Sequence, residues 1–200
     1  MKRNVNKIFI LTTCQISSIT EIKEILYNSI RNYQEHKIIS DIVQGDSPQT
    51  ISTLCNECMP ILEKIEGGKS EKTISFAEGL VHYLLTIALI PSQRKITFAS
   101  VDVDVVIPDI STLSSMPENA LVISFPKTND PVALKKRVIE LTKIQPHKEN
   151  MWFVLENELP LEVKTYKVDN SEKEPFMNII NDIIWFTSNR KQSKLKIFKI

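Results

Sequence analysis

The chain has 200 residues, 42% of them hydrophobic and 24% charged, which is the balance of one globular domain with a core of its own. Lysine and arginine number 25 against 24 acidic residues, so the net charge of +1 creates no global field that attracts nucleic acid. With only four glycines, the sequence holds neither the GxGxxG dinucleotide fingerprint nor a P-loop. Three cysteines are too few for a disulfide framework, and no signal peptide or membrane span is recognisable, so we expect a cytoplasmic protein.

The N-terminal region is predicted to contain a strand followed by a helix. Residues 7–13 (KIFILTT) form a short β-branched run typical of a buried strand. Ser18 and Glu21 have the spacing of a capping box, and the apolar residues that follow recur at helical intervals. We therefore expect a helix from this point to about Tyr33.

The next stretch is predicted to hold a short element and a second helix. Residues 38–43 are expected to be a short strand or a loop. Ser47-Pro48 is typical of a helix start, and Pro60 is expected to kink or end that helix. A flexible break is expected at residues 67–70, where two glycines stand together.

Residues 73–90 carry the clearest helical pattern in the chain. Ser75, Glu78, His82 and Thr86 form one polar stripe at about 3.6-residue spacing, and the other faces are apolar. A helix with so narrow a polar stripe is expected to be mostly buried.

In residues 100–107 (SVDVDVVI), apolar side chains at positions 101, 103, 105 and 107 alternate with polar side chains at positions 100, 102 and 104. This pattern predicts a strand with one apolar and one polar face, and Arg94 and Lys95 are expected to stand at the start of this strand. The remaining predicted elements are a strand over 120–126, a helix from Asp130-Pro131 with residues 135–137 pointing outward, strands over 151–157 and 161–168, and a final helix over 175–188. The order predicts a mixed α/β (α+β) fold, a single domain over residues 1–190 with a mixed sheet flanked by helices, and a basic tail over 191–200.

Cys55 and Cys58 lie at i and i+3 on one predicted helix face, together with apolar residues. Two thiols can contribute to a metal site, but a closed site needs four ligands and the chain has only one other cysteine. A redox CxxC requires an electropositive helix start, which is not evident here. We therefore favour two core cysteines.

Acidic side chains on the predicted helix and strand provide the material for a divalent-metal site. Glu78 and His82 share a helix face, and Asp102 and Asp104 share a strand face, so their side chains can converge on Mg²⁺. This raises the alternative of a metal-dependent nuclease.

The same region is similar in layout to the PD-(D/E)xK nucleases. One predicted strand ends in Asp109 and the next ends in Lys127, but Phe125 stands where the signature requires an acid. The only strand-borne acid-x-Lys triplet is residues 162–164, and such triplets arise by chance in a chain this charged. We keep a degenerate nuclease, or a nucleic-acid-binding relative of one, as the alternative function.

Basic side chains form two small clusters that are candidates for phosphate contacts. They are Arg94 and Lys95 before the acidic strand, and Lys135, Lys136 and Arg137 on the helix that follows. Exposed helix faces carry such charges routinely, so a solvated surface is the competing interpretation.

The second half of the chain resembles one family in particular. The helix FAEGLVHYLLTIALI precedes QRKITFASVDVDVVIPDISTLSSM and ENALVISFP, and residues 162–168 (EVKTYKV) precede a terminal helix, MNIINDIIWF. The sequence is similar in this order to the TPRKB family, the kinase-binding small subunit of the KEOPS complex, which has a strand of type K-x-R-T-L-S-x-E and an ending of type E-V-K-K-I-Y-K-L. The resemblance covers residues 5–35 and 73–190, with 36–72 as an insertion carrying an extra helix. Thr97 and Asp102 replace the family's strand Arg and Glu.

The resemblance implies a non-catalytic subunit without a cofactor, bound metal or small-molecule substrate. It implies that the chain binds the small atypical kinase of KEOPS and helps to hold the tRNA 3′ end while threonylcarbamoyladenosine is formed. Phe98 and Tyr166 are candidates to stack a single-stranded base. The kinase-binding candidates lie on the terminal helix, which is apolar over more than one face; they are Ile180, Ile184, Trp185 and Phe186.

Overall fold

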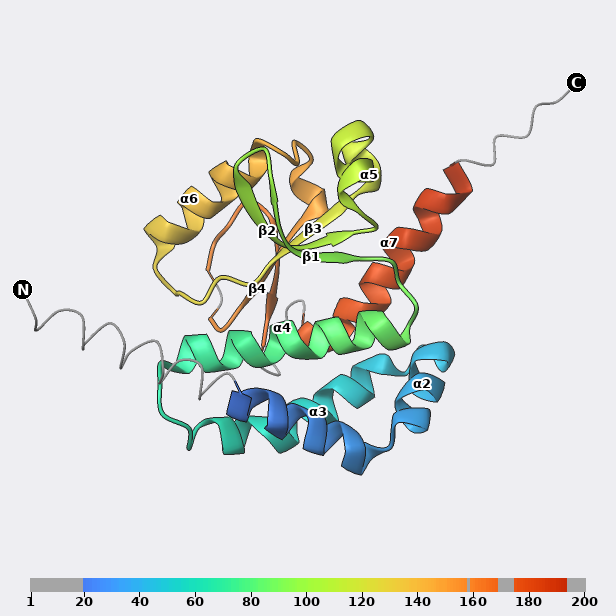
Figure 1. Cartoon of the computed structure of the whole chain (residues 1–200), viewed down its shortest axis with the longest axis vertical. Helices are drawn as coiled ribbons and strands as arrows, with labels where there is room; N and C mark the ends of the chain where they lie inside the picture. The colour runs from blue at the N-terminus through green and yellow to red at the C-terminus, as the bar shows by residue number, and fades with distance from the viewer. Residues whose placement is uncertain (1–19, 158, 169–174, 194–200) are drawn as a thin grey trace, which may run out of the picture.

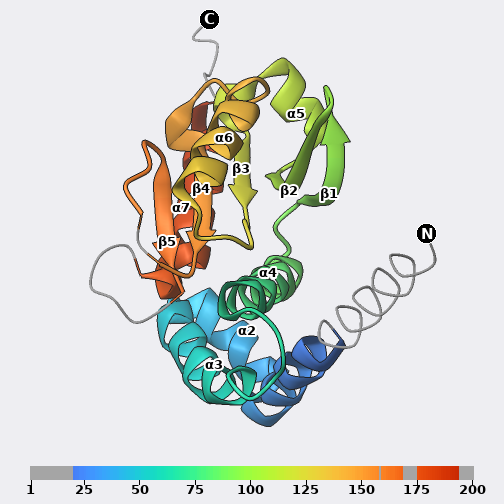
Figure 2. The ribbon, with the colours of Figure 1, turned by 90° about the vertical axis from the view of Figure 1, so that its left-hand side faces the viewer.

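The computed structural model describes residues 20–157, 159–168 and 175–193, and every structural statement below concerns these residues. They form a mixed α+β domain around a five-stranded sheet, which confirms the predicted fold class. Four helices gather at one end of the molecule, and the sheet with its flanking helices forms the other end (Figures 1 and 2). The predicted strand over residues 7–13 and the capping residue Ser18 lie outside the described residues.

The helical end contains residues 20–33, α2 (Glu35–Gln44), α3 (Ser47–Leu62) and α4 (Lys69–Ile87). The prediction of a strand or loop over 38–43 is wrong, because α2 covers this segment. Ile38 and Ile42 stand one helical turn apart, and both are buried against the other helices. Their β-branched type suggests a strand, but their spacing places them on the inner face of a helix.

Helices α3 and α4 differ slightly from their predicted bounds. Asp46 is the N-cap of α3, and the helix ends at Leu62, just past Pro60. Helix α4 starts four residues before its predicted start, directly after the two glycines. The Lys72 ammonium turns back to donate a hydrogen bond to the Ile65 carbonyl, and this contact ties the start of α4 to the end of α3.

The sheet has the strand order β1-β2-β3-β4-β5, in which β1, β2 and β3 pair antiparallel and β3, β4 and β5 pair parallel. Helix α6 crosses over from β3 to β4, as a parallel connection requires. The elements are β1 (Gln93–Phe98), β2 (Val101–Ile107), α5 (Ile110–Ser115), β3 (Leu121–Ser124), α6 (Pro131–Thr142), β4 (Met151–Leu155), β5 (Lys164–Lys167) and α7 (Ile179–Ser193).

Strands β1 and β2 form a hairpin, which corrects the prediction that Arg94 and Lys95 open the acidic strand. These two cations lie on β1, antiparallel to β2. Ala99 and Ser100 make the turn with φ of 47° and 63°. Two consecutive positive φ angles are the requirement of a type I′ hairpin turn, which usually takes Asn or Gly. Because Ala-Ser carries no such signal, the turn was not recognisable in the sequence.

The apolar residues of β2 do not share one face, which is a second correction. Val101 and Val103 pack in the core under α6, whereas Val105 and Ile107 pack in the core that the sheet shares with α4 and α7. Opposite this change of face, Lys95 has φ of 48° within β1. A non-glycine residue in this region is strained and turns the strand locally.

Helix α7 joins the two ends of the molecule. The Asn181 side chain accepts from Ser47 Oγ at 2.7 Å and donates to the Gly45 carbonyl at 2.9 Å. Asp182 Oδ2 accepts from Tyr166 Oη at 2.6 Å and pairs with Lys164 Nζ at 2.8 Å. Because α2, α3, α7 and the sheet share one main core, residues 36–72 are an integral part of this domain. No helix of the described residues is long and apolar enough to cross a membrane.

Candidate functional site

The four predicted kinase-binding residues of α7 occupy different environments. Ile180 is fully buried, and Phe186 is 5% exposed and packs edge-on against the Trp152 ring. Ile184 is half-buried against the same core. Trp185 is 70% exposed. Ile180 and Phe186 therefore hold α7 on the domain, and the Trp185 ring lies on the solvent side of the helix.

An apolar pocket of about 500 Å³ lies beside α7, and Ile184 and Phe186 form one of its walls. The opposite walls come from three places that are distant in sequence: the end of α2, the turn after α4, and the junction between β2 and α5. The other lining residues are Ile42, Val43, Ala88, Leu89, Ile90, Pro91, Ile107, Pro108, Thr112, Asn119 and Thr187.

Two large aliphatic side chains of this pocket are exposed to solvent. Val43 is 82% exposed and Leu89 is 87% exposed. Single exposed apolar residues are ordinary, but two beside one concave apolar surface are typical of a protein-binding site. We call this surface the α7 pocket, defined by its lining residues. Trp185 is not one of them, because helical spacing places it on the face of α7 that points away from the lining residues Ile184 and Thr187.

Both the backbone conformation and the solvent exposure of position 89 are unfavourable for a leucine. It has φ of 53° and ends α4 in a Schellman motif, in which the Leu89 amide donates to the Thr86 carbonyl and the Ile90 amide to the Leu85 carbonyl. This position ordinarily takes glycine, because a side chain at positive φ clashes with the backbone. Leu89 thus contributes little to the fold, although its side chain forms part of the pocket.

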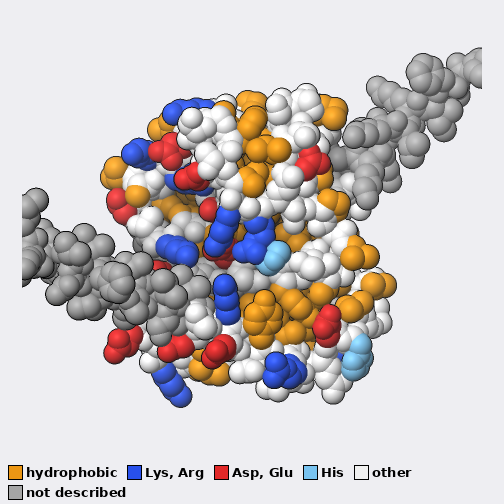
Figure 3. Space-filling model, in the orientation of Figure 1, with side chains coloured by type: hydrophobic (Ala, Val, Ile, Leu, Met, Phe, Trp, Pro, Cys, Tyr) orange, Lys and Arg blue, Asp and Glu red, His pale blue; other side chains and the backbone are white. Residues whose placement is uncertain are grey.

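A second candidate region joins α4 to β1 and carries a surplus of cationic groups. Glu78 Oε1 lies 3.5 Å from Arg94 Nη2 and 3.2 Å from Lys95 Nζ, so one carboxylate balances two cations. Lysine and arginine side chains and one histidine gather where α4 runs beneath β1 (Figure 3). We call Glu78, His82, Arg94 and Lys95 the basic band.

The basic band contains polar atoms that the described residues leave without a hydrogen-bond partner. They are His82 Nδ1 and Arg94 Nε, with Ser75 Oγ on the same stripe of α4. Burial and the neighbouring Arg94 charge hold the pKa of His82 below its ordinary value, against a smaller opposite effect of Glu78. His82 is therefore neutral at pH 7, and the net positive charge of the band comes from Arg94 and Lys95 against the one carboxylate of Glu78.

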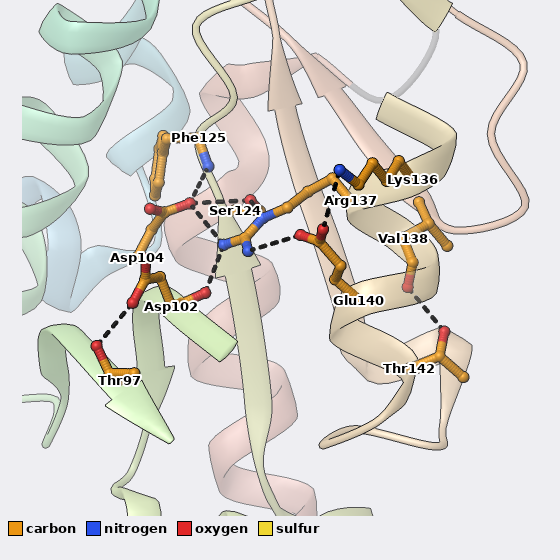
Figure 4. A network of polar contacts seen from close by, with 10 residues as sticks. All are labelled: Thr97, Asp102, Asp104, Ser124, Phe125, Lys136, Arg137, Val138, Glu140 and Thr142. Atoms are coloured by element: carbon orange, nitrogen blue, oxygen red, sulfur yellow. Dashed lines mark hydrogen bonds and ion pairs between the residues drawn. The ribbon is translucent and has the colours of Figure 1, made fainter. Parts of the chain in front are cut away.

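Arg137 is not an outward-facing cation, which corrects the prediction for residues 135–137. Its guanidinium reaches inward from α6 and donates to the Asp102 carbonyl at 2.7 Å and to Ser124 Oγ at 3.3 Å (Figure 4). It also pairs with Asp104 at 3.7 Å and with Glu140 at 3.9 Å. Arg137 therefore fastens α6 to the hairpin and is unavailable as a free phosphate-binding group.

The two other predicted cations of α6 remain on its surface. Lys135 and Lys136 are both exposed, and Lys136 lies 3.9 Å from Glu140. Tyr166, a candidate for base stacking, is fully buried and hydrogen-bonded to Asp182. Phe98 is partly buried beside the core under α6. Of the predicted RNA-contacting groups, Arg94, Lys95, Lys135 and Lys136 keep accessible surface.

The acidic residues proposed for a metal site are not brought together. Glu78 forms ion pairs with Arg94 and Lys95. Asp104 Oδ2 accepts hydrogen bonds from Ser124 Oγ and from the Phe125 amide, each at 2.8 Å. Asp109 caps α5 by accepting from the Thr112 amide at 2.8 Å. Within the described part of the chain, no three metal-ligating side chains form a cluster.

Cys55 and Cys58 lie in the main core, as predicted. Burial raises the pKa of Cys55 to about 12, with a smaller effect of Cys58, and burial also raises the pKa of Cys58. A thiol with a raised pKa is a poor nucleophile and a poor metal ligand at neutral pH. The CxxC segment therefore packs α3 into the core.

Sequence reasoning missed the α7 pocket, because its walls come from segments that only the fold brings together. The one local signal was an apolar run that continues from the end of α4 through residues 88–91, where a polar C-cap is usual. Comparison of the chain with protein-family models, with curated proteins and with solved structures finds no significant match.

Proposed function

We propose that this protein is a non-catalytic subunit of a KEOPS-type complex in the cytoplasm, where it binds the small atypical kinase and helps to hold tRNA. The proposal combines the sequence resemblance with one structural observation. That observation is the α7 pocket, an apolar concave surface whose exposed side chains, Val43 and Leu89, add little to the stability of the isolated domain.

A partner side chain that enters the α7 pocket removes apolar surface from water on both sides. Each large apolar side chain that becomes buried contributes about 1.5–3 kcal/mol. Val43 and Leu89 supply this gain without any change in the domain core, since they are exposed in the isolated chain. Trp185, on the outer face of α7, adds an exposed aromatic ring, a residue type that is enriched in binding hot spots.

The basic band is the surface that we assign to tRNA. Arg94 and Lys95 share the single carboxylate of Glu78, so a phosphate that approaches the pair is attracted by the surplus positive charge. Lys95, whose side chain is 68% exposed, is the more accessible of the two. Because such contacts release counterions, the proposal predicts tRNA affinity that falls as the salt concentration rises.

Affinity capture with the purified small kinase of the same organism tests the kinase part of this proposal. Wild-type protein is expected to retain the kinase, and Trp185→Ala is expected to lose most of it. Val132→Ala is the matched control, because Val132 is 75% exposed but lies on α6. Absence of capture by the wild type, or equal capture by Trp185→Ala, would contradict the assignment.

A filter-binding titration with tRNA tests the second part. Lys95→Ala is expected to weaken binding, and Lys23→Ala on the exposed side of the first helix is expected to leave it unchanged. Loss of binding with tRNA that lacks its 3′ terminal nucleotides supports the role in holding that end. If Lys95→Ala and Lys23→Ala bind tRNA with the same affinity, the basic band is not part of the tRNA-binding surface.

One observation favours the alternative, a degenerate PD-(D/E)xK-type metal-dependent nuclease or a nucleic-acid-binding relative of one. Asp104 on β2 accepts a hydrogen bond from the amide of Phe125, the position at which the nuclease signature requires an acid, and Arg137 contacts both Asp104 and the neighbouring Ser124. Cleavage of nucleic acid that requires Mg²⁺ or Mn²⁺ and is lost in Asp104→Asn would establish this function instead.

A further inference from the structure

A groove of about 730 Å³ lies along the outer side of α6, between this helix and the segment that leads into β5. Lys135, Ile139 and Lys143 of α6 form one wall, and Lys148, Leu161 and Glu162 lie across from them. Helix α6 covers the face of the sheet opposite to α7 (Figure 2), so this groove is separate from the α7 pocket.

Helix α6 has apolar residues on two faces. Leu134 and Leu141 are fully buried and point to the sheet. Val132 and Ile139 are 75% and 66% exposed, and because they are seven residues apart they share the outer face. The inner stripe suffices to dock α6 on the sheet, so the outer stripe is left for a contact with another molecule.

Lysine side chains surround the exposed Ile139. Lys135 and Lys143 stand one helical turn before and one turn after it, and within the described part of the chain neither forms an ion pair. The hydrogen bond and charge of Lys148 lower the pKa of the Glu162 carboxyl on the opposite wall, and the Lys135 charge adds to this effect. Because three lysines and one carboxylate line the groove, it presents an aliphatic centre in a surrounding of net positive charge.

This chemistry selects among possible partners. Single-stranded nucleic acid is bound through aromatic side chains that stack on bases, and no aromatic residue lines the groove. An exposed isoleucine between lysines matches a helix that carries apolar residues along one side and carboxylates beside them. Its carboxylates would pair with the lysines while its apolar side covers Ile139.

We propose that the α6 groove binds an acidic amphipathic helix of a partner protein, with Ile139 as the apolar anchor and Lys135 and Lys143 as the charge contacts. This interaction is independent of kinase binding through the α7 pocket, since the two surfaces lie on opposite faces of the sheet.

The test uses a fluorescent helical peptide with leucines at i, i+3 and i+7 and glutamates at the flanking positions. Wild-type protein is expected to raise its fluorescence anisotropy, and Ile139→Asp is expected to weaken binding by about tenfold or more. Val43→Asp is the matched control, because Val43 is at least as exposed but belongs to the α7 pocket. Thermal melts establish that both variants are folded.

Charge reversal supplies a second, independent measurement. A peptide with lysine in place of each glutamate is expected not to bind the wild type, and Lys135→Glu with Lys143→Glu is expected to reverse this preference. Three outcomes would overturn the proposal: no binding of the acidic peptide, equal binding by Ile139→Asp, or displacement of the peptide by single-stranded RNA with the same dependence on Ile139.

Discussion

Helices α6 and α7 pack on opposite faces of one sheet, yet they leave different chemistry on the surface. Helix α7 buries three isoleucines and Phe186, lines an apolar pocket and exposes Trp185 on its outer face. Helix α6 buries two leucines, points an arginine inward and exposes aliphatic residues among lysines. The comparison shows that the residues outside the core define what each face can bind, because both helices are already docked without them.

The largest expected loss of stability distinguishes a core residue of α7 from a surface residue of the same helix. Phe186→Ala removes a buried ring that packs on Trp152 and is expected to destabilise the domain by about 3–5 kcal/mol. The neighbouring Trp185→Ala is expected to change stability by less than about 0.5 kcal/mol, since its ring is exposed. Urea denaturation measures both values. Similar losses in the two variants would show that Trp185 belongs to the core.

The second effect tests the internal role of Arg137 on α6. Arg137→Met leaves Asp104 without its cation and is expected to cost about 2 kcal/mol, less than for a fully buried pair because the guanidinium is partly exposed. Lys136→Met on the same helix is the control and is expected to be neutral.

Adding Asp104→Asn to Arg137→Met is expected to restore part of the lost stability, because the half-buried carboxylate that has lost its cation is then replaced by a neutral amide. Strict additivity of the two substitutions in chemical denaturation would show that this pair is not coupled.

A smaller change in stability, in the stabilising direction, is expected for a substitution of Leu89. Leu89→Gly relieves the strain of a side chain at positive φ and removes an exposed leucine, so the melting temperature is expected to stay unchanged or to rise. Differential scanning calorimetry measures this change. A clear destabilisation would mean that the Leu89 side chain packs in the isolated domain.

The smallest effect concerns the protonation of His82 in the basic band. Its pKa is lowered in the folded state, so the unfolded chain binds the proton more tightly and stability falls as the pH drops below about 6.5. His82→Gln is expected to flatten this part of the stability profile and to leave it unchanged above neutral pH. The free energy of unfolding, measured between pH 5 and 8, reports the difference. If the wild type and His82→Gln showed the same dependence of stability on pH, the titrating group would be a residue other than His82.

Helical spacing in the sequence carried more information than charge or residue type. Arg137 stands three residues after Leu134 and four before Leu141, so it shares their inward face, although its place in a basic run suggests a solvated side chain. The same reasoning recovers α2 from Ile38 and Ile42.

Other features had no local signal. The turn at Ala99-Ser100 lacks the residues that its backbone favours, and the change of face in β2 depends on the strained Lys95 of the neighbouring strand. The α7 pocket and the α6 groove each combine segments that only tertiary packing brings together.

Isothermal titration of the small kinase with wild-type protein and with Leu89→Gly shows whether the α7 pocket binds the kinase, because this substitution removes a pocket side chain and is expected not to weaken the fold. We expect the wild type to bind and Leu89→Gly to bind at least about tenfold more weakly, a loss of about 1.4 kcal/mol, while its melting temperature is equal or higher. If the wild type does not bind the kinase, or if the variant binds it equally well, the α7 pocket is not the kinase-binding site.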